Sequence, residues 1–168
     1  LKGILHCLTT PRKDLKQRGY RNTNIMHEFL FVTGLLSAAL LLGSMVFFSC
    51  IMAPLIFIKL DEAIAGPFVR SVFPWYYLVI IGLSAVGALG LITIQPLPAV
   101  ILAVIGIAAV LARQVLMPRI NDHRDKMVGG NAEAERAFQR LHRSSVWING
   151  GQLIGSVAVL LMLGVSKF

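Results

Sequence analysis

The sequence predicts an all-α integral membrane protein, a bundle of four transmembrane helices, and three observations lead to that class. Hydrophobic residues make up 56% of the 168 residues and charged residues only 14%, and the mean hydropathy is +0.73. Asp, Glu, Lys and Arg are absent from 29–58, 71–112 and 144–166, which together exceed half of the chain. About 20 apolar residues cross a bilayer as a helix. This composition excludes a soluble enzyme, a secreted disulfide scaffold and a disordered protein.

The three uncharged runs correspond to four spans. The first run is longer than one bilayer crossing requires, so its helix tilts, or it bends and ends near Pro54. The second run suits two helices, and it breaks at residues 95–98 because proline cannot donate to a helix and restricts the residue before it. Pro118 is expected to end the third helix. We therefore predict spans at about 29–58, 75–93, 97–117 and 145–165.

The distribution of basic residues predicts the orientation. Most of them lie in or beside the first and third loops: Lys59, Arg70, Arg113, Arg119, Arg124, Lys126, Arg136, Arg140 and Arg143. Cytoplasmic loops carry an excess of Lys and Arg. We therefore expect both long loops in the cytoplasm and both termini outside, in a bacterial inner membrane.

The N-terminal residues 1–25 contradict this orientation, because they contain six basic residues and one acidic residue. Met26 directly precedes the first apolar run, so we expect 1–25 to be an upstream extension and 26–168 to be the transmembrane domain. A basic targeting segment and a cytoplasmic tail that reverses the topology are the alternatives. Without 1–25 the net charge falls from +8 to +3. The basic balance is therefore no argument for nucleic acid as a partner.

A cytoplasmic amphipathic helix is expected to lead into the fourth span. Asn131 can cap its N-terminus, and Ala134, Phe138 and Leu141 share an apolar face that can lie along the membrane. A parallel basic stripe is well placed for lipid phosphates. It consists of Arg136, Arg140 and Arg143.

Polar residues recur at steps of three and four along the run that joins this helix to the fourth span: His142, Ser145, Asn149, Gln152 and Ser156. An unpaired amide in hydrocarbon is costly, so Asn149 and Gln152 must face the bundle, a partner or a wet cavity. Interhelical hydrogen bonding is the favoured interpretation, and a ligand or ion cavity or a homo-oligomer contact are the alternatives. Gly151 and Gly155 form a GxxxG pattern, which predicts a helix-packing face.

Signs of catalysis are absent from the sequence. The second and third spans contain no ionisable group in their interiors before Arg113, near the cytoplasmic end, and no P-loop, CxxC pair, HExxH or nucleophile elbow occurs. Asp122, His123 and Asp125 cluster without a recognised metal-ligand spacing. We therefore expect no catalytic residue, no cofactor and no metal site. Cys50 is expected to be a buried packing residue.

Several short strings together resemble one family of small membrane proteins. They are GSMVFF at 43–48, APLIF at 53–57, VFPWYY at 72–77, LMPRI at 116–120 and LHRSS at 141–145. Over about residues 29–165 the chain resembles the transmembrane protein 205-like family (domain of unknown function 4149). The resemblance implies a four-helix membrane protein without an established activity. The positions that match the family pattern are Pro54, Phe73, Pro74, Tyr76, Pro118, His142, Ser145 and Asn149.

Our leading expectation for function is a non-enzymatic bundle that packs with itself or with another membrane protein through the glycine face and the polar stripe. The alternative is a small transporter or binding protein for a metal ion or an amphipathic solute, with His142, Asn149 and Gln152 lining its cavity. A membrane oxidoreductase comes third, because no pair of histidines lies within the spans to hold haem. The lipid bilayer is the one partner expected in every case.

Overall fold

Four long helical rods make up the chain in a computed structural model, which describes the backbone of residues 2–166 and the side chains of 21–166 except Glu62. Two rods contain a π-helical turn in which the helix widens by one residue. The elements are α1 (Lys2–Phe47), η1 (Phe48–Met52), α2 (Ala53–Lys59), α3 (Glu62–Leu91), α4 (Pro96–Leu111), η2 (Ala112–Leu116), α5 (Met117–Val128) and α6 (Ala132–Val165).

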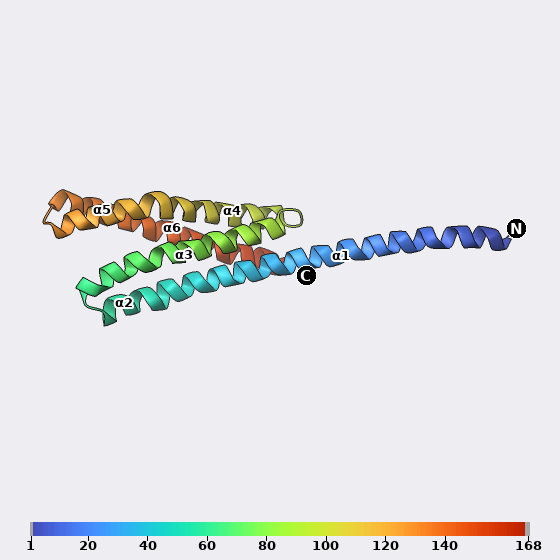
Figure 1. The fold of residues 1–168 in the computed structure, drawn as a ribbon, viewed down its shortest axis with the longest axis horizontal. Coiled ribbons are helices and arrows are strands. Elements are labelled where there is room, and N and C mark those ends of the chain that lie inside the picture. Colours follow the sequence, from blue (N-terminus) through green and yellow to red (C-terminus); the bar gives the residue numbers. More distant parts are fainter. Residues whose placement is uncertain (1, 167–168) are drawn as a thin grey trace.

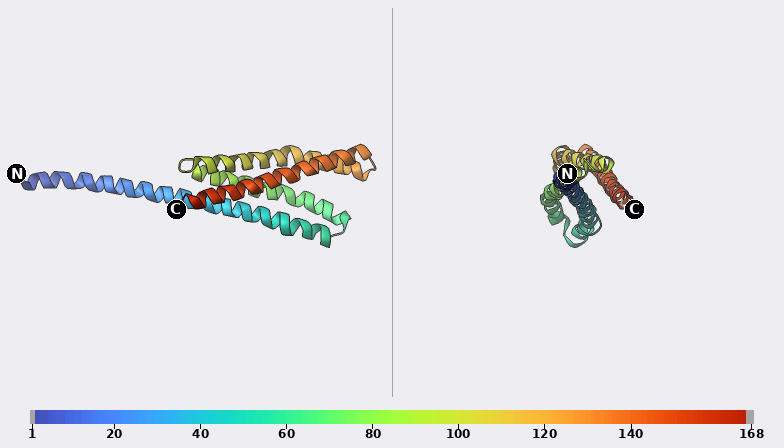
Figure 2. Two further views of the ribbon diagram at one scale, coloured as in Figure 1. Left: turned by 180° about the vertical axis from the view of Figure 1, so that it is seen from behind. Right: turned by 90° about the vertical axis from the view of Figure 1, so that its right-hand side faces the viewer.

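The rods run antiparallel to their neighbours in the sequence (Figure 1). The connections at 60–61 and 129–131 lie at one end of the bundle, which we call the loop end, and the 92–95 hairpin lies at the other (Figure 2). All four rods are long and apolar enough to cross a membrane: Arg21–Lys59, Ala63–Leu91, Pro96–Val128 and Ala132–Val165. The predicted all-α, four-span architecture is confirmed.

The N-terminal part of α1 continues beyond the bundle as an unbroken helix (Figures 1 and 2). It includes residues 2–25 of the segment that the sequence suggested as an extension. The side chains of residues 1–20 lie outside the described part of the chain.

The predicted helix boundaries at the loop end were wrong. The third rod does not end at Pro118 but continues to Val128, and α3 begins at Glu62 rather than near Trp75, with Pro74 inside it. A proline ring clashes with the carbonyl four residues back in a regular α-helix. The π-helical turn η2 directly precedes Met117-Pro118, and the Met117 N–H bonds to the Ala112 carbonyl five residues back. This wider turn lets the rod continue through the proline.

The segment expected as an amphipathic helix forms the first turns of α6. Asn131 caps it, accepting hydrogen bonds from the backbone N–H groups of Glu133 and Ala134 at 3.0 and 3.1 Å. No break separates this segment from the span, since α6 is continuous from Ala132 to Val165. Ala134 is buried, and the segment packs against α5 as one arm of a hairpin.

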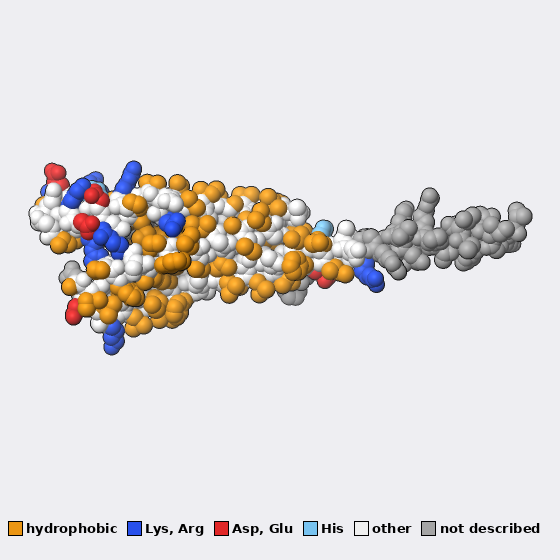
Figure 3. All heavy atoms as spheres, in the orientation of Figure 1, with side chains coloured by type: hydrophobic (Ala, Val, Ile, Leu, Met, Phe, Trp, Pro, Cys, Tyr) orange, Lys and Arg blue, Asp and Glu red, His pale blue; other side chains and the backbone are white. Residues whose placement is uncertain are grey.

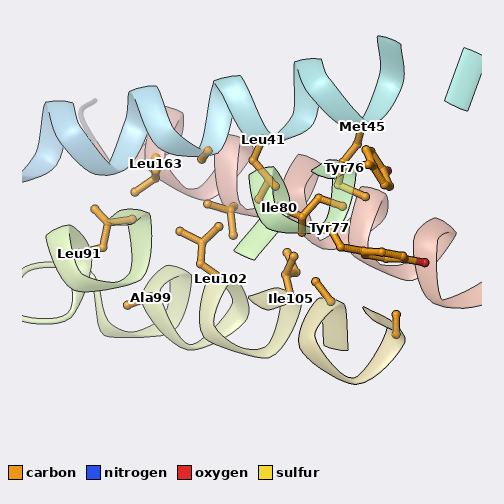
Figure 4. Close-up of a cluster of buried hydrophobic side chains, with 14 residues drawn as sticks. Leu41, Met45, Tyr76, Tyr77, Ile80, Leu91, Ala99, Leu102, Ile105 and Leu163 are labelled. Carbon is orange, nitrogen blue, oxygen red and sulfur yellow. The ribbon is translucent and has the colours of Figure 1, made fainter. Parts of the chain in front are cut away.

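Aliphatic side chains from all four rods, together with Tyr76 and Tyr77 of α3, form the core shown in Figure 4. Leu41, Met45, Ile80 and Leu102 are fully buried at its centre. Small residues let the rods approach closely, as membrane helices require. A Cβ atom on Gly90 would lie 3.2 Å from the Leu30 carbonyl oxygen of α1.

The outer surface is apolar over the bundle, and most of the charged side chains visible in Figure 3 gather at the loop end. Large exposed side chains such as Leu40, Leu89, Val104 and Leu161 give it the character of a lipid-facing surface. Cys50 also lies on this surface as an exposed free thiol, so the expectation that it is buried was wrong.

Candidate functional site

A cavity of about 400 Å³ lies at the loop end, between the second half of the first rod, α3, α5 and α6. Its volume is within the range of small-molecule sites, about 300–1,000 Å³. Most of its lining side chains are apolar or aromatic, and a few polar groups converge on it, which is the usual composition of a ligand pocket. The lining residues are Phe48, Ser49, Ala53, Ile56, Phe57, Val69, Arg70, Phe73, Tyr76, Tyr77, Met117, Ile120, Asn121, Arg124, Phe138, His142, Ser145, Val146 and Asn149.

Three hydrogen-bonded side chains form the inner end of the cavity. The Tyr76 hydroxyl of α3 donates to Asn149 Oδ1 of α6 at 2.8 Å, and Asn149 Nδ2 donates to Ser49 Oγ of η1 at 3.0 Å. We call these residues the Tyr76–Asn149–Ser49 triad. It connects three rods and satisfies an amide that would be costly to leave unpaired in a membrane. The ring of Phe48 stacks on Tyr76 with a centroid distance of 4.3 Å.

The outer end of the cavity is basic. Arg124 of α5 lies directly against Gly66 of α3, where any Cβ atom would collide with its guanidinium group. Arg70 pairs with Asp125 at 2.8 Å, and both side chains are substantially exposed. Among the lining residues that the structure describes, none is acidic. Two arginines therefore face a cavity whose described walls offer no counter-charge.

The predicted polar stripe of α6 divides into two parts. His142, Ser145 and Asn149 line the cavity. Gln152 and Ser156 are buried below it, where Gln152 Nε2 donates to the Ile105 carbonyl of α4 at 3.0 Å. The Ser156 hydroxyl donates to the Gln152 carbonyl at 2.8 Å. The part of the stripe nearer the loop end thus faces a cavity, and the part farther from the loop end makes hydrogen bonds inside the bundle.

The two glycines of the GxxxG pattern have different surroundings. A Cβ on Gly155 would lie 3.3 Å from Ile105 Cδ1, so this glycine packs closely on α4. A Cβ on Gly151 would meet nothing within 4 Å, and Gly151 is exposed. The two residues do not share one contact face within a single chain.

The three arginines predicted to meet lipid phosphates, Arg136, Arg140 and Arg143, are all exposed. The first two also line an open, polar hollow of about 440 Å³ between α5 and α6.

The two acidic residues of the sequence cluster Asp122, His123 and Asp125 are paired with bases. Asp122 pairs with Lys126 at 2.7 Å, and Asp125 pairs with Arg70. Within the described residues, no group of three or more His, Cys, Asp or Glu side chains could hold a metal ion.

Sequence reasoning missed the partners of Asn149 and the basic end of the cavity. Ser49 and Tyr76 are separated from Asn149 by 100 and 73 positions, and periodicity within one helix cannot pair such residues. Arg70 and Arg124 were read as ordinary loop charges. The local signal at Gly66 pointed the other way, because the pair Gly66-Pro67 is typical of a turn or loop rather than of a helix that packs on an arginine.

Comparison with known proteins identifies a family and nothing further. A search of the curated proteins and a search of the solved structures each found no match. A family model described as a domain of unknown function (DUF4149) matches residues 36–128, which is more than half of the chain. The match includes Ser49, Gly66, Tyr76 and Arg124 and ends before α6. The chain therefore belongs to the DUF4149 family.

Proposed function

We propose that this protein is a non-enzymatic membrane protein that binds an amphipathic molecule in the cavity at the loop end. The cavity is the observation that carries the proposal: it has the size of a ligand site, apolar walls and polar groups at both ends. A bundle that served only for packing would have no need of such a space, because well-packed interiors contain few voids larger than a water molecule.

The depth of the cavity supports an amphipathic occupant. Trp75 and Trp147 are 71% and 76% exposed. Trp75 directly precedes Tyr76 in the sequence, and Trp147 lies two positions before Asn149. Exposed tryptophans prefer the membrane–water interface. The triad then lies near that interface, and the basic end of the cavity extends into the head-group region.

We also propose that the loop end faces the cytoplasm, because its loops and flanks hold nine basic residues. The charged side chains gathered at this end in Figure 3 support a location outside the hydrocarbon. In this orientation the cavity receives its ligand from the cytoplasmic leaflet or from the cytoplasm.

Filling the cavity tests the proposal. The full chain is held in a non-ionic amphipol, and its Tm is measured with increasing dodecanoate, dodecyl phosphate or dodecanol. A ligand that binds only the folded state raises stability by about 2.7 kcal/mol at 100 times its Kd. The rise should disappear in Ala53→Trp, which fills the cavity, and persist in the control Ala85→Trp on the lipid-facing surface of α3. Absence of a rise with all three amphiphiles would overturn the proposal.

A helix-packing role remains a second candidate, and the open surface around Gly151 favours it. Gly150 and Gly151 have no neighbours within 4 Å of an added Cβ, and the exposed Trp147 and Ile154 flank them. Small residues on an exposed face allow another transmembrane helix to approach closely. If a second copy or another protein packs there, Gly151→Leu should shift the size of the complex in detergent while Gly82→Leu, at an equally open position on α3, leaves it unchanged.

A further inference from the structure

We infer that the ligand of this cavity carries an anionic head group, a carboxylate or a phosphate, bound by Arg124 with the help of Arg70. The inference rests on the proposed function, and it adds the chemical class of the ligand. It depends on three features of the outer end: the seat of Arg124, the weak pairing of Arg70, and the apolar walls between these arginines and the triad.

Helix α3 provides the space in which the Arg124 guanidinium group lies. Gly66 is buried, and its missing side chain leaves the space that the guanidinium group occupies. Arg124 is itself half-buried. Within the side chains described for 21–166, which exclude Glu62, Arg124 has no hydrogen-bond or ion-pair partner. A partly desolvated guanidinium group is stabilised by an anion, and its planar fork binds carboxylate and phosphate in two-point geometry.

Arg70 is available to the same anion. Its partner Asp125 is not among the lining residues, and the side chains of the pair are 44% and 64% exposed. Exposed ion pairs of this kind contribute little, about 0–1 kcal/mol. A head group that reaches Arg124 can therefore draw Arg70 away from Asp125 at small cost.

The remaining walls orient the bound molecule. Phe73, Met117, Ile120 and Phe138 line the space between the arginines and the triad. Apolar surface there accommodates a chain or ring. The head group then lies at the charged loop end, and the apolar part points toward the Tyr76–Asn149–Ser49 triad.

Probes that share one tail test the inference. The full chain in non-ionic amphipol is titrated with dodecanoate, dodecyl phosphate, dodecanol and dodecyltrimethylammonium, and Kd is taken from the rise in Tm with concentration. We expect one or both anions to bind at least about tenfold more tightly than dodecanol, as a charge-assisted hydrogen bond would give. The two anions distinguish a carboxylate ligand from a phosphate ligand.

Two variants should remove this preference by different routes. Arg124→Gln removes the charge, and Gly66→Ala keeps the charge but displaces the guanidinium group. Both should bring the anion affinity to within about threefold of the dodecanol affinity, which itself should stay unchanged. The matched controls are Arg119→Gln, an exposed position on the same helix, and Gly82→Ala, an open position on the same helix as Gly66. Both controls should keep the preference.

The outcomes separate the inference from the proposed function. Equal affinity for anionic, neutral and cationic probes, lost in Ala53→Trp, would overturn the anionic head group and leave an amphiphile-binding cavity. If the preference for anions persists in both Arg124→Gln and Gly66→Ala, the assignment of Arg124 as the residue that binds the head group would be wrong. Absence of binding by all probes would overturn the proposed function itself.

Discussion

The Tyr76–Asn149–Ser49 triad should stabilise the bundle as one coupled unit. Asn149→Ala removes both hydrogen bonds and leaves the Tyr76 hydroxyl, on a residue only 8% exposed, without its acceptor. Interhelical hydrogen bonds in membranes average about 0.6 kcal/mol and reach about 1.7 kcal/mol. A buried donor left unsatisfied costs about 1–3 kcal/mol. We therefore expect the free energy of unfolding to fall by about 2 kcal/mol.

A double-mutant cycle measures the coupling. The full chain is unfolded with guanidinium chloride in non-ionic micelles, which adds no anionic amphiphile that could occupy the cavity, and circular dichroism follows the loss of helix. In a Tyr76→Phe background, Asn149→Ala no longer strands a hydroxyl, so its cost should fall by about 1 kcal/mol or more. The control is Asn121→Ala, the same change at a second cavity-lining amide, with an expected cost below about 0.5 kcal/mol.

The two backgrounds also provide the refutation. If Asn149→Ala costs the same with Tyr76 and with Phe at that position, within about 0.3 kcal/mol, the side chains are not coupled. The hydrogen bond at 2.8 Å would then contribute nothing to stability, and the inner end of the cavity would not be a fixed structure.

Three further changes have expected outcomes in the same unfolding assay. Gly34→Ala places a Cβ within a leucine side chain of α3 and should cost about 1–3 kcal/mol, whereas Gly43→Ala, with nothing within 4 Å, should cost nothing or stabilise by up to about 1 kcal/mol, because alanine favours a helix over glycine. Gln152→Met should cost less than about 1 kcal/mol, because the lost hydrogen bond to α4 is offset by removal of a buried, unpartnered Oε1; a loss above 2 kcal/mol would contradict this. Asp125→Asn should change stability by less than about 1 kcal/mol, because its pair with Arg70 is exposed; a larger loss would show that the pair holds the loop end together.

The number of spans could be predicted from the sequence because lipid imposes a simple rule. A charged side chain within hydrocarbon is expensive, so uncharged runs mark the segments that cross. This rule weakens at the loop end, where helices leave the hydrocarbon and polar residues are compatible with both helix and loop. Glu62 and Val128 are accordingly helix ends that the hydropathy pattern could not locate. The cap at Asn131 was predictable because it depends only on local backbone geometry.

The candidate site was predictable only in part. The residues of one wall all lie on α6, where helical periodicity relates them, whereas the other walls come from other rods. The steps of three and four from His142 to Asn149 place these residues on one face of α6 in any structure. That Ser145 and Asn149 meet a cavity, whereas Gln152 meets a carbonyl of α4, depends on where the other rods approach α6. Such distances are set by tertiary packing, and a single sequence contains no information on pairs so far apart.

Pro54 and Pro118 explain why two rods continue past a proline, and they help to shape the cavity. In an α-helix, residues five apart point about 140° away from each other, yet Phe48 and Ala53 both line the cavity. The Ala53 N–H bonds to the Phe48 carbonyl, and this π-helical bond brings the two residues toward one face just before Pro54. The turn before Pro118 has the same bond pattern. Each of these two prolines is thus accommodated by a widened turn, and this turn changes which residues of the following helix face the bundle. The segments that follow these turns, α2 and α5, supply two walls of the cavity. Pro54 and Pro118, which would normally end a helix, therefore help to shape the site.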